Sequence, residues 1–298
     1  MEYIRRKVDN NSKLNSKLNR LFTFGCSHTC YRWPTWANMI GLEYAEHYNF
    51  GQAGADNFSI LNKIIRVNDY FDITEDDTIL IMLTSWDRID YYTGDYGWNG
   101  IGGITSDNIQ EIYGRKFQEM HMDNFDYEIE RTYTYLQSII KILDSLKCKY
   151  KIKNAFSLGR HAGSEFVKTP STKNTLQKIK KLCGGFDSLY KALNKGDHHD
   201  DINPTYSFIT DGGKLKPDGH LDIKTHLEFC KEHFSEFYND KWDDVVLECE
   251  NHITTNSDKV INHFKSIRYF FINNRCYHHI WPCDHIVPEG KPLTKSKI

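Results

Sequence analysis

One short stretch, Leu21–Thr29, constrains the fold of this chain more than any other part of it. It begins with the apolar run Leu-Phe-Thr-Phe, which is typical of a buried strand, and breaks at Gly25 into small and polar residues. Such a break is typical of a parallel strand, and open α/β sheets bind their ligands at the carboxyl ends of the strands. The sequence therefore predicts an α/β domain in which Ser27 stands where a nucleophile can act.

Further strands and helices alternate along the chain. Glu43–Phe50 and Asp77–Thr84 are predicted to be strands, and an amphipathic pattern predicts a helix over Asp126–Leu146. A further strand is predicted over Tyr150–Leu158. This alternation favours a mainly parallel sheet covered by helices.

Three sequence blocks resemble those of the SGNH (GDSL-type) hydrolase family. Gly25–Thr29 resembles the first block, usually Gly-Asp-Ser-x-Thr, Asn49–Asn57 resembles the second, and Lys216–His226 resembles the fifth. The chain is also similar to divergent SGNH-like proteins of large tailed phages. The resemblance implies a three-layer α/β/α, flavodoxin-like fold with a mainly parallel sheet over residues 20–240.

The resemblance also implies catalytic roles. Ser27 would be the nucleophile and His220 its base, and the backbone N–H groups of Ser27 and Gly54 would stabilise an oxyanion. Asp218 would orient the imidazole, although the family spacing is Asp-x-x-His and this chain has Asp-x-His. Asp222 is the other local candidate for that role.

The choice of nucleophile has one alternative, because Cys26 stands where the first block usually has Asp. A thiolate is a better nucleophile than a hydroxyl. Position within the block favours Ser27 over Cys26.

The third block departs from the family pattern. Trp86 stands where the family has an asparagine that donates its side-chain amide to the oxyanion. Arg88, Asn57 or the Trp86 indole could replace this donor, and the charge of Arg88 suits it best. The alternative is that Arg88 only forms a surface ion pair with Asp87 or Asp90.

Residues 91–125 are rich in tyrosine and glycine and are predicted to form a long irregular insert. Such an insert favours contact with a substrate or a partner, although a passive loop or an oligomer contact would have the same composition. The aromatic residues expected to bind substrate are Trp86, Tyr91, Tyr92 and Trp98.

The ends of the chain are predicted to lie outside the hydrolase-like domain. Residues 1–19 read as a polar arm, and residues 241–298 as a small, mostly helical C-terminal extension. Asp197–Asp201 and Arg275–His285 contain metal-ligand residue types, but neither has the spacing of a common metal site. We therefore expect no metal and no cofactor.

Charge and hydropathy exclude several classes of partner. The 298 residues carry a formal net charge of −2, so no global basic field favours nucleic acid. No apolar run approaches the roughly 18 residues that a membrane span needs. The eight cysteines are scattered and follow no secretory signal, so we expect mostly reduced thiols and cytoplasmic synthesis, with a place in a virus particle left open.

The function expected from these features is serine ester hydrolysis that removes acyl groups, O-acetyl above all, from a carbohydrate. The alternative is a catalytically inactive SGNH-like module that binds glycans or serves in virion assembly, with residues 241–298 as its docking element. Contacts between copies of the chain are compatible with both.

Overall fold

The computed structural model describes residues 20–31, 33–93, 97–104, 106–156, 169–184, 189, 206–209, 215–255 and 279–280. The predicted arm over residues 1–19, the cluster at 197–201 and both cysteines of the 275–285 cluster, Cys276 and Cys283, lie outside these residues.

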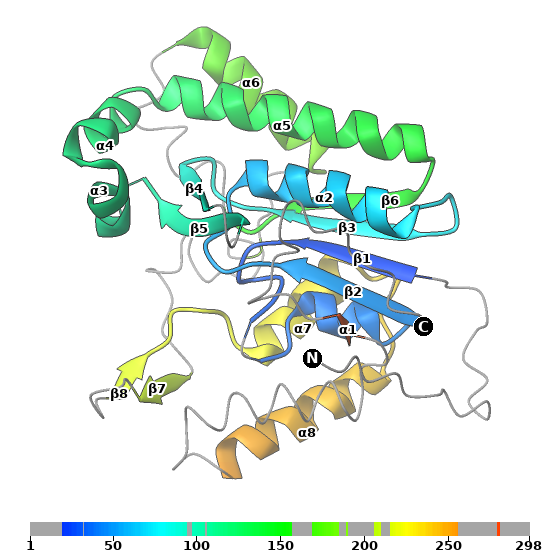
Figure 1. Cartoon of the computed structure of the whole chain (residues 1–298). Coiled ribbons are helices and arrows are strands. Elements are labelled where there is room, and N and C mark those ends of the chain that lie inside the picture. The colour runs from blue at the N-terminus through cyan, green and yellow to red at the C-terminus, as the bar shows by residue number, and fades with distance from the viewer. Residues whose placement is uncertain are drawn as a thin grey trace.

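A parallel sheet forms the centre of the molecule, with strand order β6-β3-β1-β2-β9 (Figure 1). Every neighbouring pair is parallel, so the predicted α/β architecture with a mainly parallel sheet is confirmed. The strands are β1 (Arg20–Gly25), β2 (Glu46–Gly51), β3 (Thr78–Leu83), β6 (Lys149–Asn154) and β9 (His279–Ile280).

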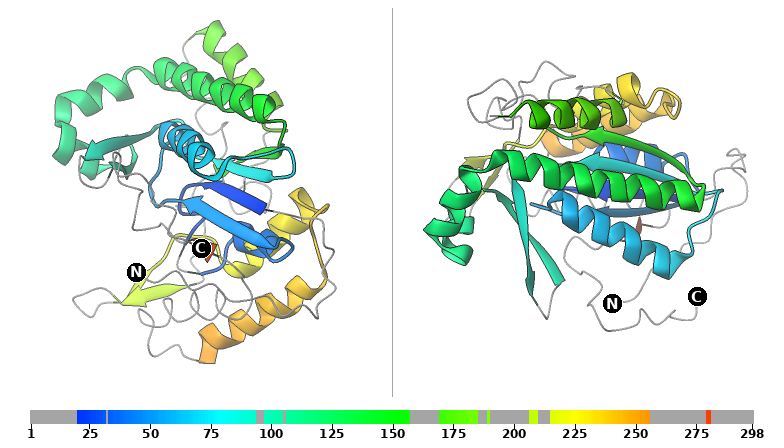
Figure 2. Two further views of the ribbon diagram at one scale, coloured as in Figure 1. Left: turned by 45° about the vertical axis from the view of Figure 1, so that its right-hand side comes forward. Right: turned by 90° about the horizontal axis from the view of Figure 1, so that it is seen from above.

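Helices cover both faces of this sheet (Figures 1 and 2). One face carries α2 (Asn57–Phe71), α5 (Phe125–Leu146) and α6 (Pro170–Leu182). The other face carries α1 (Trp36–Gly41), α7 (Ile223–His233) and α8 (Lys241–Thr255).

The central strand β1 is buried on both of its faces. Leu21 belongs to the apolar cluster on the side of α1, α7 and α8, whereas Phe22 and Phe24 belong to the cluster on the side of α2 and α5. Alternating side chains therefore anchor β1 between the two layers. This anchoring fixes the position of the carboxyl end of β1, and with it the start of the loop that carries Ser27.

In the described part of residues 91–125, the predicted irregular insert is instead mostly regular structure. The strands β4 (Arg88–Thr93) and β5 (Gly97–Gly103) pair as an antiparallel hairpin, and α3 (Asp107–Tyr113) and α4 (Arg115–Met122) follow. The hairpin was missed because its glycines obscure the alternation of apolar and polar residues by which a strand is recognised.

Helix α8, which begins at Lys241, contributes to the same core as the residues before it. Trp242 is 1% exposed, and it shares an apolar cluster with Val246, Cys249 and Trp36 of α1. Its indole Nε1–H also donates to Glu43 Oε1 at 2.7 Å. The predicted domain boundary at residue 240 therefore does not separate α8 from the core.

A second small hairpin leads to the predicted catalytic segment. It consists of β7 (Ser207–Ile209) and β8 (Leu215–Pro217), and Asp218 follows β8 directly. α7 starts after its N-cap Asp222, whose side chain accepts the Thr225 N–H at 2.7 Å.

Five cysteines of the described residues are buried free thiols, as expected: Cys26, Cys148, Cys183, Cys230 and Cys249. Cys30 is the exception, because it is disulfide-bonded.

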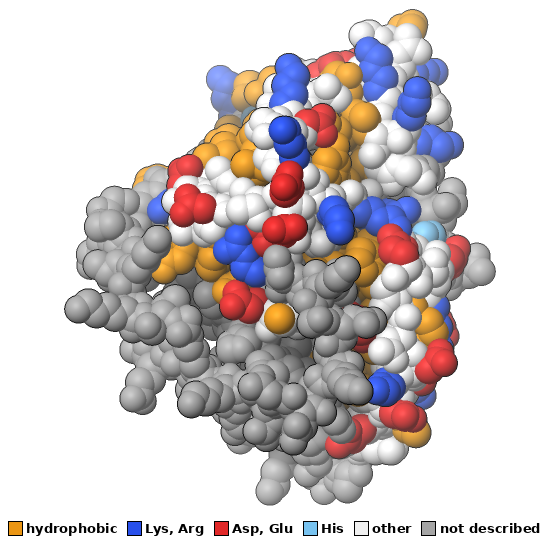
Figure 3. All heavy atoms as spheres, turned by 90° about the vertical axis from the view of Figure 1, so that its right-hand side faces the viewer, with side chains coloured by type: hydrophobic (Ala, Val, Ile, Leu, Met, Phe, Trp, Pro, Cys, Tyr) orange, Lys and Arg blue, Asp and Glu red, His pale blue; other side chains and the backbone are white. Residues whose placement is uncertain are grey.

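Among the described residues, no helix is both long and apolar enough to cross a bilayer. On the face seen in Figure 3, Lys and Arg side chains lie among Asp and Glu side chains. The described part of this face therefore carries charges of both signs.

We predict that Trp242→Ala lowers the free energy of unfolding by about 3–5 kcal/mol, because it leaves a large cavity in the core. Leu247→Ala on the same helix is the control, since Leu247 is 55% exposed and should change stability little. Urea unfolding of both variants measures the difference. Equal stability of the two variants would mean that α8 is an appendage after all.

Candidate functional site

Ser27 lies in a tight turn at the carboxyl end of β1. The turn is closed by Thr29 N–H, which donates to Cys26 O at 2.9 Å. A Cβ atom on Gly25 would lie 2.9 Å from the carbonyl oxygen of Met82 on β3. Only glycine fits at this position, so β1 can approach β3 closely immediately before the turn.

The structure brings the three predicted catalytic residues together. His220 Nε2 lies 2.9 Å from Ser27 Oγ, across a separation of 193 residues in the sequence. His220 Nδ1 lies 2.7 Å from Asp218 Oδ1, which also accepts the backbone N–H of His220 at 3.0 Å. The shorter Asp-x-His spacing is therefore compatible with a Ser-His-Asp arrangement.

Asp218 has the electrostatic properties of a residue that orients an imidazole. It is only 3% exposed, and this burial alone would raise its pKa. Its hydrogen bond to His220, the charge of that imidazole and a hydrogen bond from Tyr31 together outweigh burial, so the pKa of Asp218 is lowered. An ionised Asp218 favours the tautomer with the proton on Nδ1, which leaves Nε2 to accept the Ser27 proton.

Two further polar residues of the same block have structural roles, namely Asp222 and His226. Asp222 is the N-cap of α7 and therefore does not compete with Asp218 for His220. His226 is 1% exposed, and burial lowers its pKa to about 3, so it is neutral inside the core.

Cys26 is buried in the core, whereas Ser27 contacts the imidazole of His220. The Cys26 side chain is fully buried in the apolar cluster beside α1 and α7. The geometry therefore favours Ser27 as the nucleophile.

The loop that carries Gly54 lies beside the Ser27 loop because β1 and β2 pair in register. Gly25 is the partner of Gly51, and Gln52 N–H donates to Gly25 O at 3.0 Å. In the described part of the chain, no backbone hydrogen bond uses the N–H of Ser27 or of Gly54. Both groups are thus available to bind an oxyanion.

Gly54 itself adopts a conformation that favours glycine, with φ of +73°. A Cβ at this position would lie 2.9 Å from the backbone of Gly100 on β5. The hairpin therefore braces the loop that carries the predicted oxyanion donor.

Asn49 is a structural residue of the site to which the sequence analysis gave no role. Its side-chain Nδ2 donates to Thr29 O at 2.8 Å, and its Oδ1 accepts Gly51 N–H at 3.0 Å. One amide thus links the end of β2 to the loop after β1. Its place at the start of the second sequence block was the signal that could have revealed this role.

Of the residues proposed to replace the missing amide donor, Asn57 and Trp86 are engaged elsewhere. The Asn57 side chain donates to Thr84 O at 3.1 Å and accepts Thr84 N–H at 2.9 Å. Trp86 is 2% exposed and packs against Phe125 of α5. The prediction that Trp86 contacts substrate is therefore not supported, because its ring is part of the core.

Arg88 remains as a candidate donor. Its guanidinium lies 4.9 Å from the ring centroid of Phe156, and Phe156 packs edge-on against His28. The His28 ring in turn lies 4.9 Å from His220. Arg88 Nη1 is buried and has no hydrogen-bond partner within the described residues.

The expected alternative for Arg88, an ion pair with Asp87 or Asp90, is absent from the described residues, where those carboxylates have other partners. Asp87 accepts the hydroxyl of Ser85, and Asp90 Oδ2 accepts the backbone N–H of Asp56 at 2.9 Å.

The remaining predicted substrate residues lie on the β4–β5 hairpin. Tyr92 is 43% exposed, whereas Tyr91 is half-buried against the core. Trp98 is the cross-strand partner of Tyr92 in the hairpin, and its side chain lies outside the described part of the structure.

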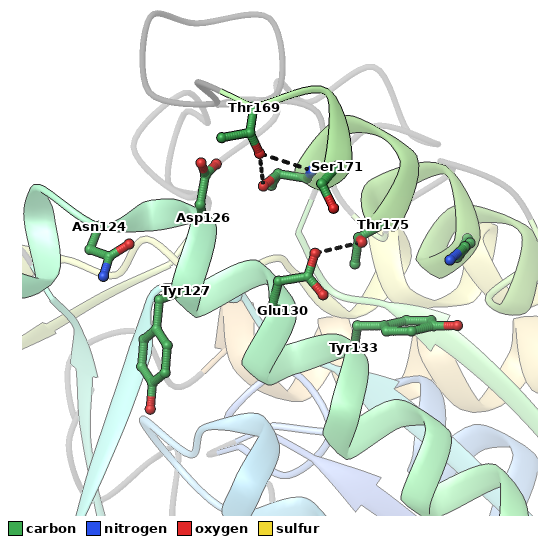
Figure 4. Close-up of a pocket in the computed structure, with 10 residues that line it drawn as sticks. Asn124, Asp126, Tyr127, Glu130, Tyr133, Thr169, Ser171 and Thr175 are labelled. Carbon is green, nitrogen blue, oxygen red and sulfur yellow. Dashed lines mark hydrogen bonds between the residues drawn. The ribbon is translucent and has the colours of Figure 1, made fainter.

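A separate open cavity of about 500 Å³ lies between α5 and α6 (Figure 4). Asp126, Glu130 and Tyr133 of α5 line it, together with Thr172 and Thr175 of α6. Thr175 Oγ1 donates to Glu130 Oε1 at 2.6 Å across this cavity. None of the three predicted catalytic residues lines it.

A buried carboxyl pair lies beside the Gly54 loop. Asp56 caps α2 by accepting Ser59 N–H at 2.7 Å, and it donates its own N–H to Asp90. Burial, followed by the charge of Asp56, raises the pKa of Asp90 to about 8. Burial also raises the pKa of Asp56.

We predict that Asp90→Asn removes the loss of folding stability that Asp90 causes in the wild type as the pH rises. Folded Asp90 keeps its proton up to about pH 8, whereas an unfolded aspartate ionises near pH ~4. Between these values the unfolded chain binds fewer protons, so the wild-type stability contribution falls as pH rises. In urea unfolding, the free energy of unfolding of Asp90→Asn relative to wild type should therefore increase as the pH rises from 5 to 8.

The control is Asp69→Asn, an exposed position on α2. A stability difference between wild type and Asp90→Asn that stays constant over this pH range would contradict the prediction.

Comparison with known proteins adds little to this geometry. No protein-family model matches the chain, and no curated protein matches it. One solved structure that it resembles is described as "a putative platelet activating factor from Streptococcus pneumonia". The match covers 73% of this chain and 83% of the other, with 15% sequence identity and a TM-score of 0.36.

Proposed function

We propose that this protein is a serine hydrolase that cleaves esters through an acyl-serine intermediate, as SGNH-type hydrolases do. The observation that carries the proposal is the 2.9 Å contact between Ser27 Oγ and His220 Nε2. A serine hydroxyl is a weak nucleophile until a positioned base takes its proton. The contact with Asp218 supplies the orientation that this base requires.

The first half of the proposed reaction forms the acyl-enzyme. Ser27 Oγ attacks the ester carbonyl carbon while its proton passes to His220 Nε2. The carbonyl oxygen becomes an oxyanion, which the N–H groups of Ser27 and Gly54 would stabilise. When the intermediate collapses, the C–O bond to the alcohol breaks and His220 returns the proton to the leaving alkoxide.

The second half regenerates the enzyme. His220 removes a proton from a water molecule, whose oxygen attacks the acyl carbon. The bond to Ser27 Oγ then breaks, Ser27 recovers its proton from His220, and the carboxylic acid leaves.

We propose small O-acyl groups on a carbohydrate, O-acetyl above all, as the substrate class. The aromatic residues of the β4–β5 hairpin support this proposal, because exposed tyrosine rings such as Tyr92 suit contact with sugar faces. The close approach of Gly100 in this hairpin to Gly54 also supports the proposal.

The test of the proposed function is turnover of p-nitrophenyl acetate. We expect Ser27→Ala to lower kcat by roughly 10⁴-fold or more, because no nucleophile replaces the hydroxyl. Cys26→Ala is the control and should retain most of the activity, since its thiol faces the core. Equal rates for wild type and Ser27→Ala would reject the proposal, and loss of activity in Cys26→Ala alone would move the nucleophile to Cys26.

We further propose Arg88 as the third oxyanion donor. Arg88→Gln should lower kcat by about 10²–10³-fold with little change in KM, because a donor that acts in the transition state is lost. Arg115→Gln is the control, since Arg115 forms an exposed ion pair with Glu119. Steady-state kinetics on an activated ester measure both, and an unchanged kcat in Arg88→Gln would exclude the role.

A further inference from the structure

The side chain of Tyr31 contacts both His220, the predicted base, and Asp218, which binds that base. Its hydroxyl donates to Asp218 Oδ2 at 2.7 Å. The face of its ring stacks on the His220 imidazole, with ring centroids 3.7 Å apart and an angle of 20° between the planes. The orientation of the carboxylate and that of the imidazole therefore depend on the same ring.

The hydroxyl completes the hydrogen bonding of a buried carboxylate. Asp218 Oδ1 already accepts both the backbone N–H and the Nδ1–H of His220. Oδ2 is the oxygen that Tyr31 binds, so the two bonds together oppose rotation of the carboxylate. A hydrogen bond to a charged group contributes more than one between neutral groups.

The ring face has a second effect, which arises only during the reaction. When His220 takes the Ser27 proton, its imidazole becomes a cation stacked on the Tyr31 ring. An aromatic face within about 6 Å attracts such a cation. The contact is then stronger in the transition state than in the resting enzyme, as catalysis requires.

Tyr31 is itself held in place by its neighbours. Its ring packs edge-on against Trp33, with centroids 4.6 Å apart. The indole N–H of the buried Trp33 donates to Leu221 O at 2.8 Å. Tyr31 and Trp33 both lie in the segment between β1 and α1. They bind the chain at Asp218 and at Leu221, on either side of His220.

We propose that Tyr31 is a positioning residue that fixes Asp218 and His220 for attack by Ser27. This inference rests on the proposed serine hydrolase function. Tyr31 acts through the carboxylate and the imidazole, and no contact with the reacting carbonyl is required.

The test compares Tyr31→Phe, which removes only the hydroxyl, with Tyr31→Leu, which also removes the ring. Tyr150→Phe is the matched control, because the Tyr150 hydroxyl also donates to an aspartate, Asp144, at 2.7 Å but on the exposed surface. Kinetics on p-nitrophenyl acetate are combined with the proton NMR signal of His220 Nδ1–H, recorded also in the Ser27→Ala background.

We expect Tyr31→Phe to lower kcat by about 10–100-fold with KM nearly unchanged, and Tyr31→Leu to lower it by a further ~2–30-fold. The Nδ1–H signal should broaden through exchange with water in Tyr31→Phe and stay sharp in Tyr150→Phe. An unchanged kcat with an unchanged signal would overturn the inference, and so would a rise in KM alone, which would make Tyr31 a substrate contact.

The NMR measurement separates this inference from the proposed function. If wild type and Ser27→Ala hydrolyse the ester equally, the hydrolase proposal fails, but the Nδ1–H signal still shows whether Tyr31 orders the Asp218–His220 pair. A signal that is equally sharp with and without the Tyr31 hydroxyl contradicts the positioning role even in an inactive protein.

Discussion

The parallel pairing of β1 with β2 and β3 is the constraint on which the rest of the site depends. Residues Leu21–Gly25 of β1 lie in register with β2, so both strands end at the same edge of the sheet. The turn that carries Ser27 and the loop that carries Gly54 leave from this edge. The side-chain amide of Asn49, near the end of β2, then binds the loop after β1 at Thr29 O. The relative position of the nucleophile and the predicted oxyanion donor thus follows from backbone pairing.

His220, the predicted base, lies in a different part of the chain, and a separate set of contacts holds it in place. Asp218 N–H donates to the carbonyl of Tyr206, and the Tyr206 hydroxyl donates to Glu250 of α8. From the other side, Trp33 and Tyr31 contact the residues around His220. Helix α8 is thus connected to the segment around Asp218 as well as to the core, which explains why it belongs with the residues before residue 240.

Much of the fold and of the site could be predicted from local sequence patterns. The apolar runs predicted β1 and β3, and helical periodicity predicted α5 to within one residue at its start. The family resemblance predicts that Ser27, His220 and Asp218 lie together, and in the structure His220 contacts both Ser27 and Asp218.

The rest could not be predicted because it depends on contacts between distant segments. Tyr31 and Asp218 are 187 residues apart in the sequence, so nothing local indicates their hydrogen bond. The sequence predicts that Trp86 contacts substrate, but in the fold its ring packs against Phe125. Trp242 resembled part of an extension because its partner, Glu43, lies 199 residues away. In each case tertiary packing between distant segments decided the role of an aromatic side chain.

The central claim is that His220 activates Ser27, and covalent labelling tests it most directly. A fluorophosphonate should modify Ser27, as peptide mapping by mass spectrometry would reveal, and His220→Ala should label at a rate lower by several orders of magnitude. Adducts on another residue, or equal labelling of Ser27 with and without His220, would contradict the account.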